Sequence, residues 1–129
     1  MELKTGIRGY AEVTVDSTNT AASVGSGLLD VYSTPAMIAL IENAAQESVR
    51  DCLAEGQGTV GMRLEVDHLA PVPVGYMVRA ETELTEISGR VLTFRAEVFS
   101  EKEKIGEGIH KRCIIDTERF LNRMNSKYN

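Results

Sequence analysis

One long helical segment among strand-like segments is the feature that most limits the folds available to this chain. The pair Thr34-Pro35 and the apolar run after it predict a helix from residue 35 to about residue 54, with Gly56 as its stop. Thr34 is the expected N-cap, because its hydroxyl can accept a free backbone N–H that the first turn leaves unpaired. Alternating, β-branched segments predict five strands, at residues 9–15, 59–68, 76–87, 91–100 and 104–116.

The order of one strand, one helix and four further strands predicts an α+β fold. Leu92, Phe94 and Ala96 alternate with charged or polar residues, so one face of that strand is apolar. We therefore expect an antiparallel sheet wrapped around one long central helix, with its other face toward solvent or a partner. A single domain is expected over residues 1–129, with a loop at 21–27 and a short, fraying helical turn at 118–129.

Composition removes several classes of function. The formal net charge is −5, and no dense cluster of Lys and Arg could follow a phosphate backbone, so nucleic acid is not an expected partner. No apolar stretch is long enough to span a membrane, and the N-terminus lacks the apolar centre of a signal peptide. Cys52 and Cys113 have no metal-ligand spacing. We expect a cytoplasmic protein with reduced thiols and no metal.

Glu42 is the residue that departs most from its surroundings. It lies in an apolar helical run, and its neighbours at helical spacing include Pro35, Ile38 and Ala39, so the pattern places it with the buried stripe. A carboxylate in such a position needs a partner or a task. It could be satisfied by backbone amides or an Arg, could reach water at the helix rim, or could belong to a functional site.

His68 and Thr34 are two further candidates. A period-two count from Val60 through Val66 places His68 on the apolar face at the end of its strand. A His there is a core or rim residue in most proteins, but together with Glu42 it favours a site. Thr34 lies two turns before Glu42, which is about 12 Å along a helix. If both serve one reaction centre, one of them comes from a second subunit across a two-fold axis.

The motifs around these residues resemble the hotdog-fold thioesterases, and most closely the fluoroacetyl-CoA thioesterase group. The resemblance covers about residues 28–120 and includes the segments Gly58-Thr59-Val60-Gly61, His68-Leu69-Ala70-Pro71 and Ile105 to Arg112. It implies a hotdog fold and a homodimer or dimer of dimers with the active site at the subunit interface. It implies no cofactor, and CoA enters only as part of an acyl-CoA substrate.

The resemblance also implies residue roles. Thr34, Glu42 and His68 correspond to the family's catalytic set, and Gly61 and Arg112 to residues that contact the acyl thioester. The family's fluoroacetyl specificity is attributed to an aromatic lid just before the catalytic Thr. Here that segment holds only Tyr32, so a short or medium acyl-CoA, or an aryl-acyl-CoA, is the expected substrate.

Four hypotheses follow from the sequence. The first is an acyl-CoA thioesterase in which Glu42 acts as nucleophile or general base. The second is a non-catalytic acyl-CoA-binding or sensor module on the same fold. The third is an enoyl-CoA hydratase or dehydratase, whose usual Asp/His signature is not visible here. In the fourth, a dimerisation domain, Glu42 and His68 only satisfy each other. Arg112 has a simpler interpretation as well, since a strand Arg most often faces solvent or an acidic neighbour.

Overall fold

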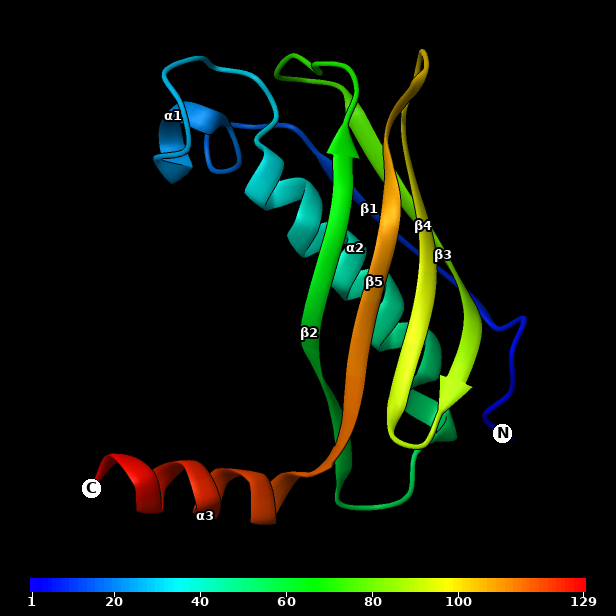
Figure 1. Ribbon diagram of the computed structural model, residues 1–129. Helices are drawn as coiled ribbons and strands as arrows, with labels where there is room; N and C mark the ends of the chain where they lie inside the picture. The colour runs from blue at the N-terminus through cyan, green and yellow to red at the C-terminus, as the bar shows by residue number, and fades with distance from the viewer.

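The computed structural model describes residues 1–129 and shows a curled antiparallel sheet packed around one long helix (Figure 1). The predicted α+β class is confirmed. The elements in chain order are β1 (Arg8–Thr14), α1 (Ala21–Val24), α2 (Thr34–Val49), the 3₁₀ turn η1 (Arg50–Cys52), β2 (Gln57–His68), β3 (Met77–Ser88), β4 (Val91–Ser100), β5 (Lys104–Asp116) and α3 (Thr117–Tyr128).

The five strands form one sheet in the order β1-β3-β4-β5-β2, and every neighbouring pair is antiparallel. The predicted boundaries of β4 and β5 are confirmed, and those of the other strands differ by one or two residues. β2 pairs only with β5, so it forms one edge of the sheet. This edge strand carries His68 at its end and Gly61 near its middle.

The core lies between α2 and the inner face of the sheet. The helix buries Met37, Ile41 and Ala44. They pack on alternate strand residues, of which Ala96 and Val98 are completely or almost completely buried. The predicted alternation in β4 is thus confirmed. Burial of these side chains fixes which face of each strand points toward the helix, because a slip of one residue would expose the whole apolar set.

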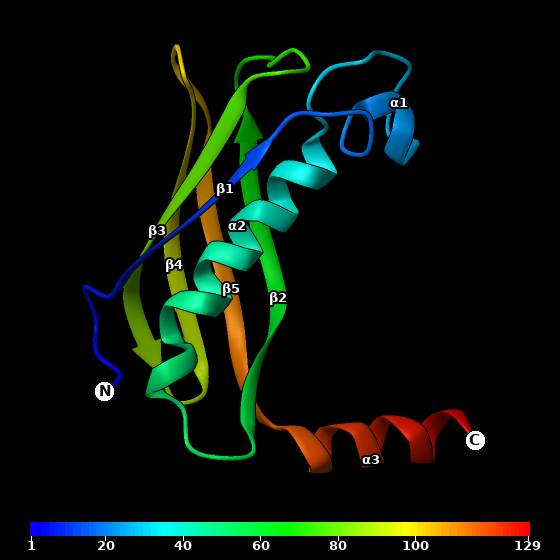
Figure 2. The same ribbon diagram turned by 180° about the vertical axis from the view of Figure 1, so that it is seen from behind.

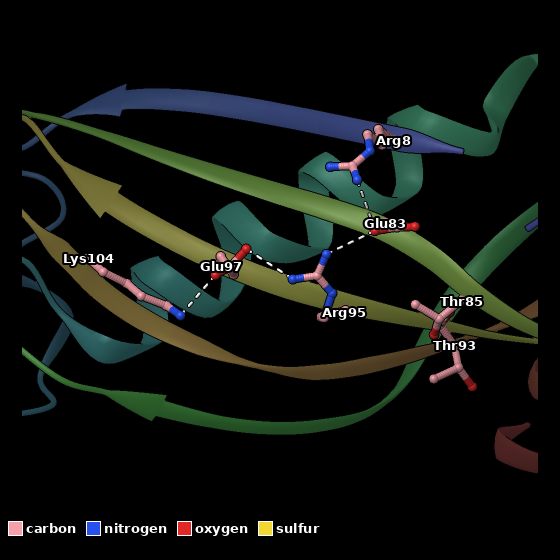
Figure 3. A network of polar contacts seen from close by, with 7 residues as sticks. All are labelled: Arg8, Glu83, Thr85, Thr93, Arg95, Glu97 and Lys104. Atoms are coloured by element: carbon pink, nitrogen blue, oxygen red, sulfur yellow. Dashed lines mark hydrogen bonds and ion pairs between the residues drawn. The ribbon is translucent and has the colours of Figure 1, made fainter. Parts of the chain in front are cut away.

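The outer face of the sheet is covered by a row of ion pairs (Figure 3). Arg95 lies at its centre, 2.9 Å from Glu83 and 3.0 Å from Glu97. Arg8 and Lys104 extend the row at its two ends, at 3.3 Å from Glu83 and 2.9 Å from Glu97. Exposed pairs of this kind add little stability each. Their main effect is to keep this face polar. The apolar side chains of the core pack on the opposite face, where α2 lies.

The predicted ends of the long helix are wrong at both termini. Ser33, not Thr34, is the N-cap, and its Oγ accepts from the N–H of Ala36 at 3.1 Å. The α-helix ends at Val49 and is followed by η1, so the expected extension to residue 54 is absent. Gly56 does not cap the helix. With φ of +82°, it makes the turn that leads into β2, a conformation for which glycine is suited.

Two other segments are more helical than the sequence pattern predicts. Residues 21–24 form the single turn α1, capped by Thr20, whose Oγ1 accepts from the N–H of Ser23 at 3.2 Å. The C-terminal segment forms the twelve-residue helix α3, which projects from the end of β5 away from the sheet (Figures 1 and 2). None of the helices is both long and apolar enough to cross a lipid bilayer.

Candidate active site

Thr34 and His68 form a hydrogen-bonded pair at the start of α2. Because Ser33 caps the helix, the hydroxyl of Thr34 is free, and it lies 2.8 Å from Nδ1 of His68 at the end of β2. The two side chains are therefore in direct contact, and their role in one site stays a prediction. Thr34 is exposed and His68 half-buried, so the pair lies at the surface of this chain.

The second nitrogen of His68 forms no close hydrogen bond, although the backbone of Ala70 is near enough to the ring to oppose part of the effect of burial on the pKa. Nε2 is buried and makes no hydrogen bond, although a buried ring nitrogen ordinarily has one. Burial also lowers the pKa of His68 below its usual value of 6.5, which keeps the imidazole neutral near pH 7. A neutral imidazole fixed by a Thr hydroxyl at one nitrogen can accept or deliver a proton at the other.

Glu42, two turns after Thr34 on α2, forms a second polar pair with Arg112 on β5. Oε2 of Glu42 lies 3.4 Å from Nη1 of Arg112. The Arg112 side chain is 7% exposed and the Glu42 side chain 38% exposed. Glu42 therefore lies on the flank of the buried stripe, and the prediction that it points with that stripe is only half right. Oε2 of Glu42 faces the Arg112 guanidinium, and the exposed part of the carboxylate is accessible to a substrate.

Arg112 is buried and does not face solvent; of the two simpler alternatives from the sequence, the acidic neighbour is the one present, and it is Glu42. Its Nε donates to Oγ1 of Thr59 at 2.8 Å, and its Nη2 donates to the carbonyl oxygen of Thr59 at 3.0 Å. Burial lowers the pKa of Arg112, and the Glu42 carboxylate opposes that shift. A guanidinium held this firmly presents Nη1 to Glu42 in a fixed direction.

A bulge in β2 places Gly61 next to Glu42 and opposite Arg112. Gly61 is paired with Arg112 and Arg63 with Lys111, so the register shifts between Gly61 and Arg63. The prediction that Val60 and Met62 share the apolar face is therefore wrong, and Met62 is 56% exposed. Instead Gly61 faces the helix, where a Cβ atom would overlap Oε2 of Glu42. Only glycine leaves room for the carboxylate beside this strand.

His110 is a site residue that the sequence reasoning missed. It is completely buried on the inner face of β5, and its Nε2 lies 3.1 Å from Nη1 of Arg112. The available signal was the same period-two count that was applied to β2. In β5 the count from Ile114 through Arg112 reaches His110 on the face that meets the helix.

The chain brings the candidates together in two clusters and not in one. Thr34 and His68 form the first, and Glu42, Gly61 and Arg112 form the second. No hydrogen bond or ion pair joins the clusters. The eight residues from Thr34 to Glu42 correspond to about 12 Å along α2. No group of three or more His, Cys, Asp or Glu side chains is arranged as metal ligands would be, and both thiols are free.

Comparison with known proteins identifies the family of this chain. Residues 15–118 match the model of the family described as fluoroacetyl-CoA-specific thioesterase. Over 98 residues the chain is 32% identical to a fluoroacetyl-CoA thioesterase of Streptantibioticus cattleyicolor. The aligned region covers 76% of this chain and 70% of that protein. The chain belongs to the fluoroacetyl-CoA-specific thioesterase family. As a member of this family it is a thioester hydrolase, and the resemblance seen in the sequence is confirmed.

Solved structures confirm the hotdog fold of this thioesterase. A structure of the fluoroacetyl-CoA thioesterase FlK has a TM-score of 0.93 and 26% identity, with 98% of each chain covered. A hot-dog-like protein from Thermanaerovibrio acidaminovorans has a TM-score of 0.89 and 22% identity, covering 97% of this chain and 93% of that one. At that lower identity the likeness shows the fold alone.

The two histidines of the thioesterase give a prediction for stability. Burial lowers the pKa of His68 and of His110 below 6.5. Just below pH 6.5 these two imidazoles are therefore more protonated in the unfolded chain than in the folded chain. The free energy of unfolding should therefore decrease as pH falls through this value. We expect a lower thermal midpoint at about pH 5.5 than at about pH 7.5, and a smaller difference in His110→Gln. A midpoint that rises on acidification would contradict the assignment of neutral, buried imidazoles.

Proposed function

We propose that this protein hydrolyses a short or medium acyl-CoA, or an aryl-acyl-CoA, to the free acid and CoA. The observation that carries the proposal is the placement of the Glu42 carboxylate. It lies beside an exposed glycine, pairs with a buried Arg and remains partly accessible. A thioester hydrolase needs such a group near the carbonyl carbon, together with positive charge or N–H donors for the oxygen.

Glu42 acts on the carbonyl carbon in one of two ways. It can attack directly and form an anhydride with the acyl group, or it can take a proton from a water molecule that attacks. In both routes the thiolate of CoA leaves. On the first route water then opens the anhydride, and when it attacks the Glu42 carboxyl carbon its oxygen enters Glu42 while the acid leaves with an oxygen from Glu42. On the second route the oxygen of water enters the acid directly. Turnover in heavy-oxygen water separates the two routes, since only direct attack leaves the label in the Glu42 side chain.

Gly61 and Arg112 are proposed to bind the carbonyl end of the thioester. Gly61 offers backbone at the surface without a side chain, directly beside Glu42. Arg112 has its Nη1 turned to the same carboxylate and its other nitrogens held by Thr59. Positive charge fixed in this way is suited to the negative charge that develops on the oxygen in the transition state.

Thr34 and His68 are proposed to reach the Glu42 cluster from a second copy of the chain. The single chain leaves the face of α2 around Glu42 only partly covered, because Pro35 and Ala39 are exposed there. Met62 is exposed on the edge strand as well. A homodimer, or a dimer of dimers, with a two-fold axis at this face would cover these residues and join the two clusters. A fully active monomer would contradict this arrangement.

A panel of acyl-CoA substrates tests the proposed specificity. The segment before α2 exposes Leu28 and Leu29, at 95% and 67%, while Tyr32 is buried in the core. The surface before Thr34 thus exposes two leucines and no aromatic ring. We expect the highest kcat/KM for thiol release with short, medium or aryl-acyl groups. The kcat/KM for fluoroacetyl-CoA should be lower than that of the best substrate by at least about tenfold. A preference for fluoroacetyl-CoA would overturn this substrate assignment.

A further inference from the structure

His110 is a buried histidine whose contacts connect the β2 bulge to the Glu42 cluster. Its side chain is completely buried, and its ring is stacked on Phe94 with 6.2 Å between the ring centroids. Burying an imidazole costs free energy unless both of its nitrogens have partners. Here both have one, and each partner belongs to the neighbourhood of the candidate site.

The two contacts fix which ring nitrogen carries the proton. Nδ1 of His110 lies 2.9 Å from the carbonyl oxygen of Arg63, which can only accept, so Nδ1 donates. Nε2 lies 3.1 Å from Nη1 of Arg112, which can only donate, so Nε2 accepts. Both bonds are satisfied together by the neutral imidazole with its hydrogen on Nδ1.

The Nη1 group of Arg112 has two N–H bonds and two neighbours. One neighbour is Nε2 of His110, and the other is Oε2 of Glu42 at 3.4 Å. With Nε and Nη2 both bonded to Thr59, the guanidinium has little freedom to rotate. The bonds to Thr59 hold the Nε and Nη2 side of the guanidinium, and the His110 acceptor takes one of the two Nη1 hydrogens and leaves the other for the Glu42 carboxylate.

We propose that His110 is a positioning residue that acts through Arg112: as a neutral acceptor it holds Nη1 and so orients the Glu42 carboxylate. The inference rests on the proposed function for its effect on turnover. The carbonyl of Arg63, which follows the β2 bulge, orients the imidazole in turn. The bulge thus serves two purposes, since it places Gly61 beside Glu42 and orients His110.

Charge around the ring supports a neutral acceptor. The charged groups that act on the imidazole are the Arg112 guanidinium and the Glu42 carboxylate, and desolvation together with Arg112 lowers the pKa of His110. Protonation would remove the acceptor at Nε2 and place a second cation beside Arg112. The site should therefore lose activity in acid when His110 takes up a proton.

Two amide variants test the inference, because each keeps one of the two hydrogen bonds. His110→Gln can place an oxygen near the position of Nε2 and accept from Arg112, while His110→Asn can donate to Arg63 but leaves Nη1 without its acceptor. We expect kcat to fall by about tenfold or more in His110→Asn and by less than about threefold in His110→Gln, with KM little changed. Equal losses in the two variants would overturn the inference.

A double-mutant cycle separates positioning from general stability. In an Arg112→Lys background, His110→Asn should cause no further loss of kcat/KM, because the residue through which it acts is already altered. Val78→Ala is the control for destabilisation, because Val78 is completely buried on β3, which pairs with β1 and β4 and not with the strands of the site. It should leave kcat/KM unchanged at temperatures below unfolding. Losses that simply multiply in the cycle would contradict the proposal.

Nitrogen NMR of the unmodified protein gives a readout that does not depend on turnover. The imidazole of His110 should show a protonated Nδ1 and an unprotonated Nε2 near pH 7. The Nη1 hydrogens of Arg112 should exchange slowly in the wild type and in His110→Gln, and faster in His110→Asn. The opposite tautomer would refute the inference even in an active enzyme. If the protein shows the expected tautomer and exchange pattern but hydrolyses no acyl-CoA, the proposed function is refuted and the positioning of Arg112 by His110 is not.

Discussion

Replacing Glu42 with Gln should abolish most thioester hydrolysis without unfolding the protein. The amide has nearly the same shape, and its oxygen can still accept from Nη1 of Arg112, so the guanidinium keeps a hydrogen bond although it loses its counter-charge. The bonds of Arg112 to Thr59 remain, so we expect a lower thermal midpoint but a folded protein. The amide can neither attack a carbonyl carbon nor take a proton from water. We expect kcat to fall by about 1,000-fold or more, measured as thiol release from the best acyl-CoA of the panel.

Glu47→Gln is the matched control for this substitution. Glu47 lies on the solvent face of the same helix, its side chain is 47% exposed, and its only ion pair is with Arg50 at the surface. The same loss of one negative charge there should change neither kcat nor the thermal midpoint noticeably. If Glu42→Gln and Glu47→Gln were equally active, Glu42 would have no part in the chemistry.

Replacing Gly61 with Ala should also cost a large part of the activity. The new Cβ would overlap Oε2 of Glu42, the far end of a flexible side chain, so the carboxylate would move and the strand would not. A displacement of about 1 Å in a reacting group can cost about 100-fold in rate. We expect a loss of that order in kcat/KM and a change of only a few degrees in the thermal midpoint.

Gly58→Ala provides the comparison on the same strand. A Cβ at Gly58 would meet Oγ1 of Thr117 at 3.5 Å, an ordinary van der Waals distance. The same change of residue type, in the same strand, should leave kcat/KM within about twofold of the wild type. Comparable losses at both glycines would point to a general effect on β2, and the close approach of Gly61 to Glu42 would have no catalytic meaning.

The strands and the main helix could be predicted because each has a strong local pattern. The alternation of Leu92, Phe94 and Ala96 with polar residues requires no knowledge of the partner strands, and all three are completely or almost completely buried as expected. The C-terminal helix was underestimated, although Phe120, Met124 and Tyr128 recur at helical spacing. All three are exposed, so tertiary packing added no further signal.

Other features depend on contacts that the sequence does not display. Ser33 and Thr34 are both good N-cap residues, and only the entry of the chain into α2 decides that Ser33 takes the role and leaves Thr34 for His68. The bulge after Gly61 is a property of the β2–β5 pair, so a simple count along β2 assigned the wrong face to Met62. His110 was missed because His and Arg at alternate positions on a strand face are not a recognisable motif.

Mixed dimers test most directly whether Glu42 of one copy works with Thr34 and His68 of another in thioester hydrolysis. Glu42→Gln and His68→Ala, carried on separate chains with different affinity tags, should each give inactive homodimers. The purified mixed dimer contains one intact site and should recover about half of the wild-type rate of thiol release.

The reciprocal dimer completes the measurement. One chain carries both substitutions, and its partner is wild type. If the sites are shared between subunits, each site contains one altered residue, and this dimer should be inactive. An inactive first dimer together with a half-active second dimer would place each complete site within one chain and contradict the account.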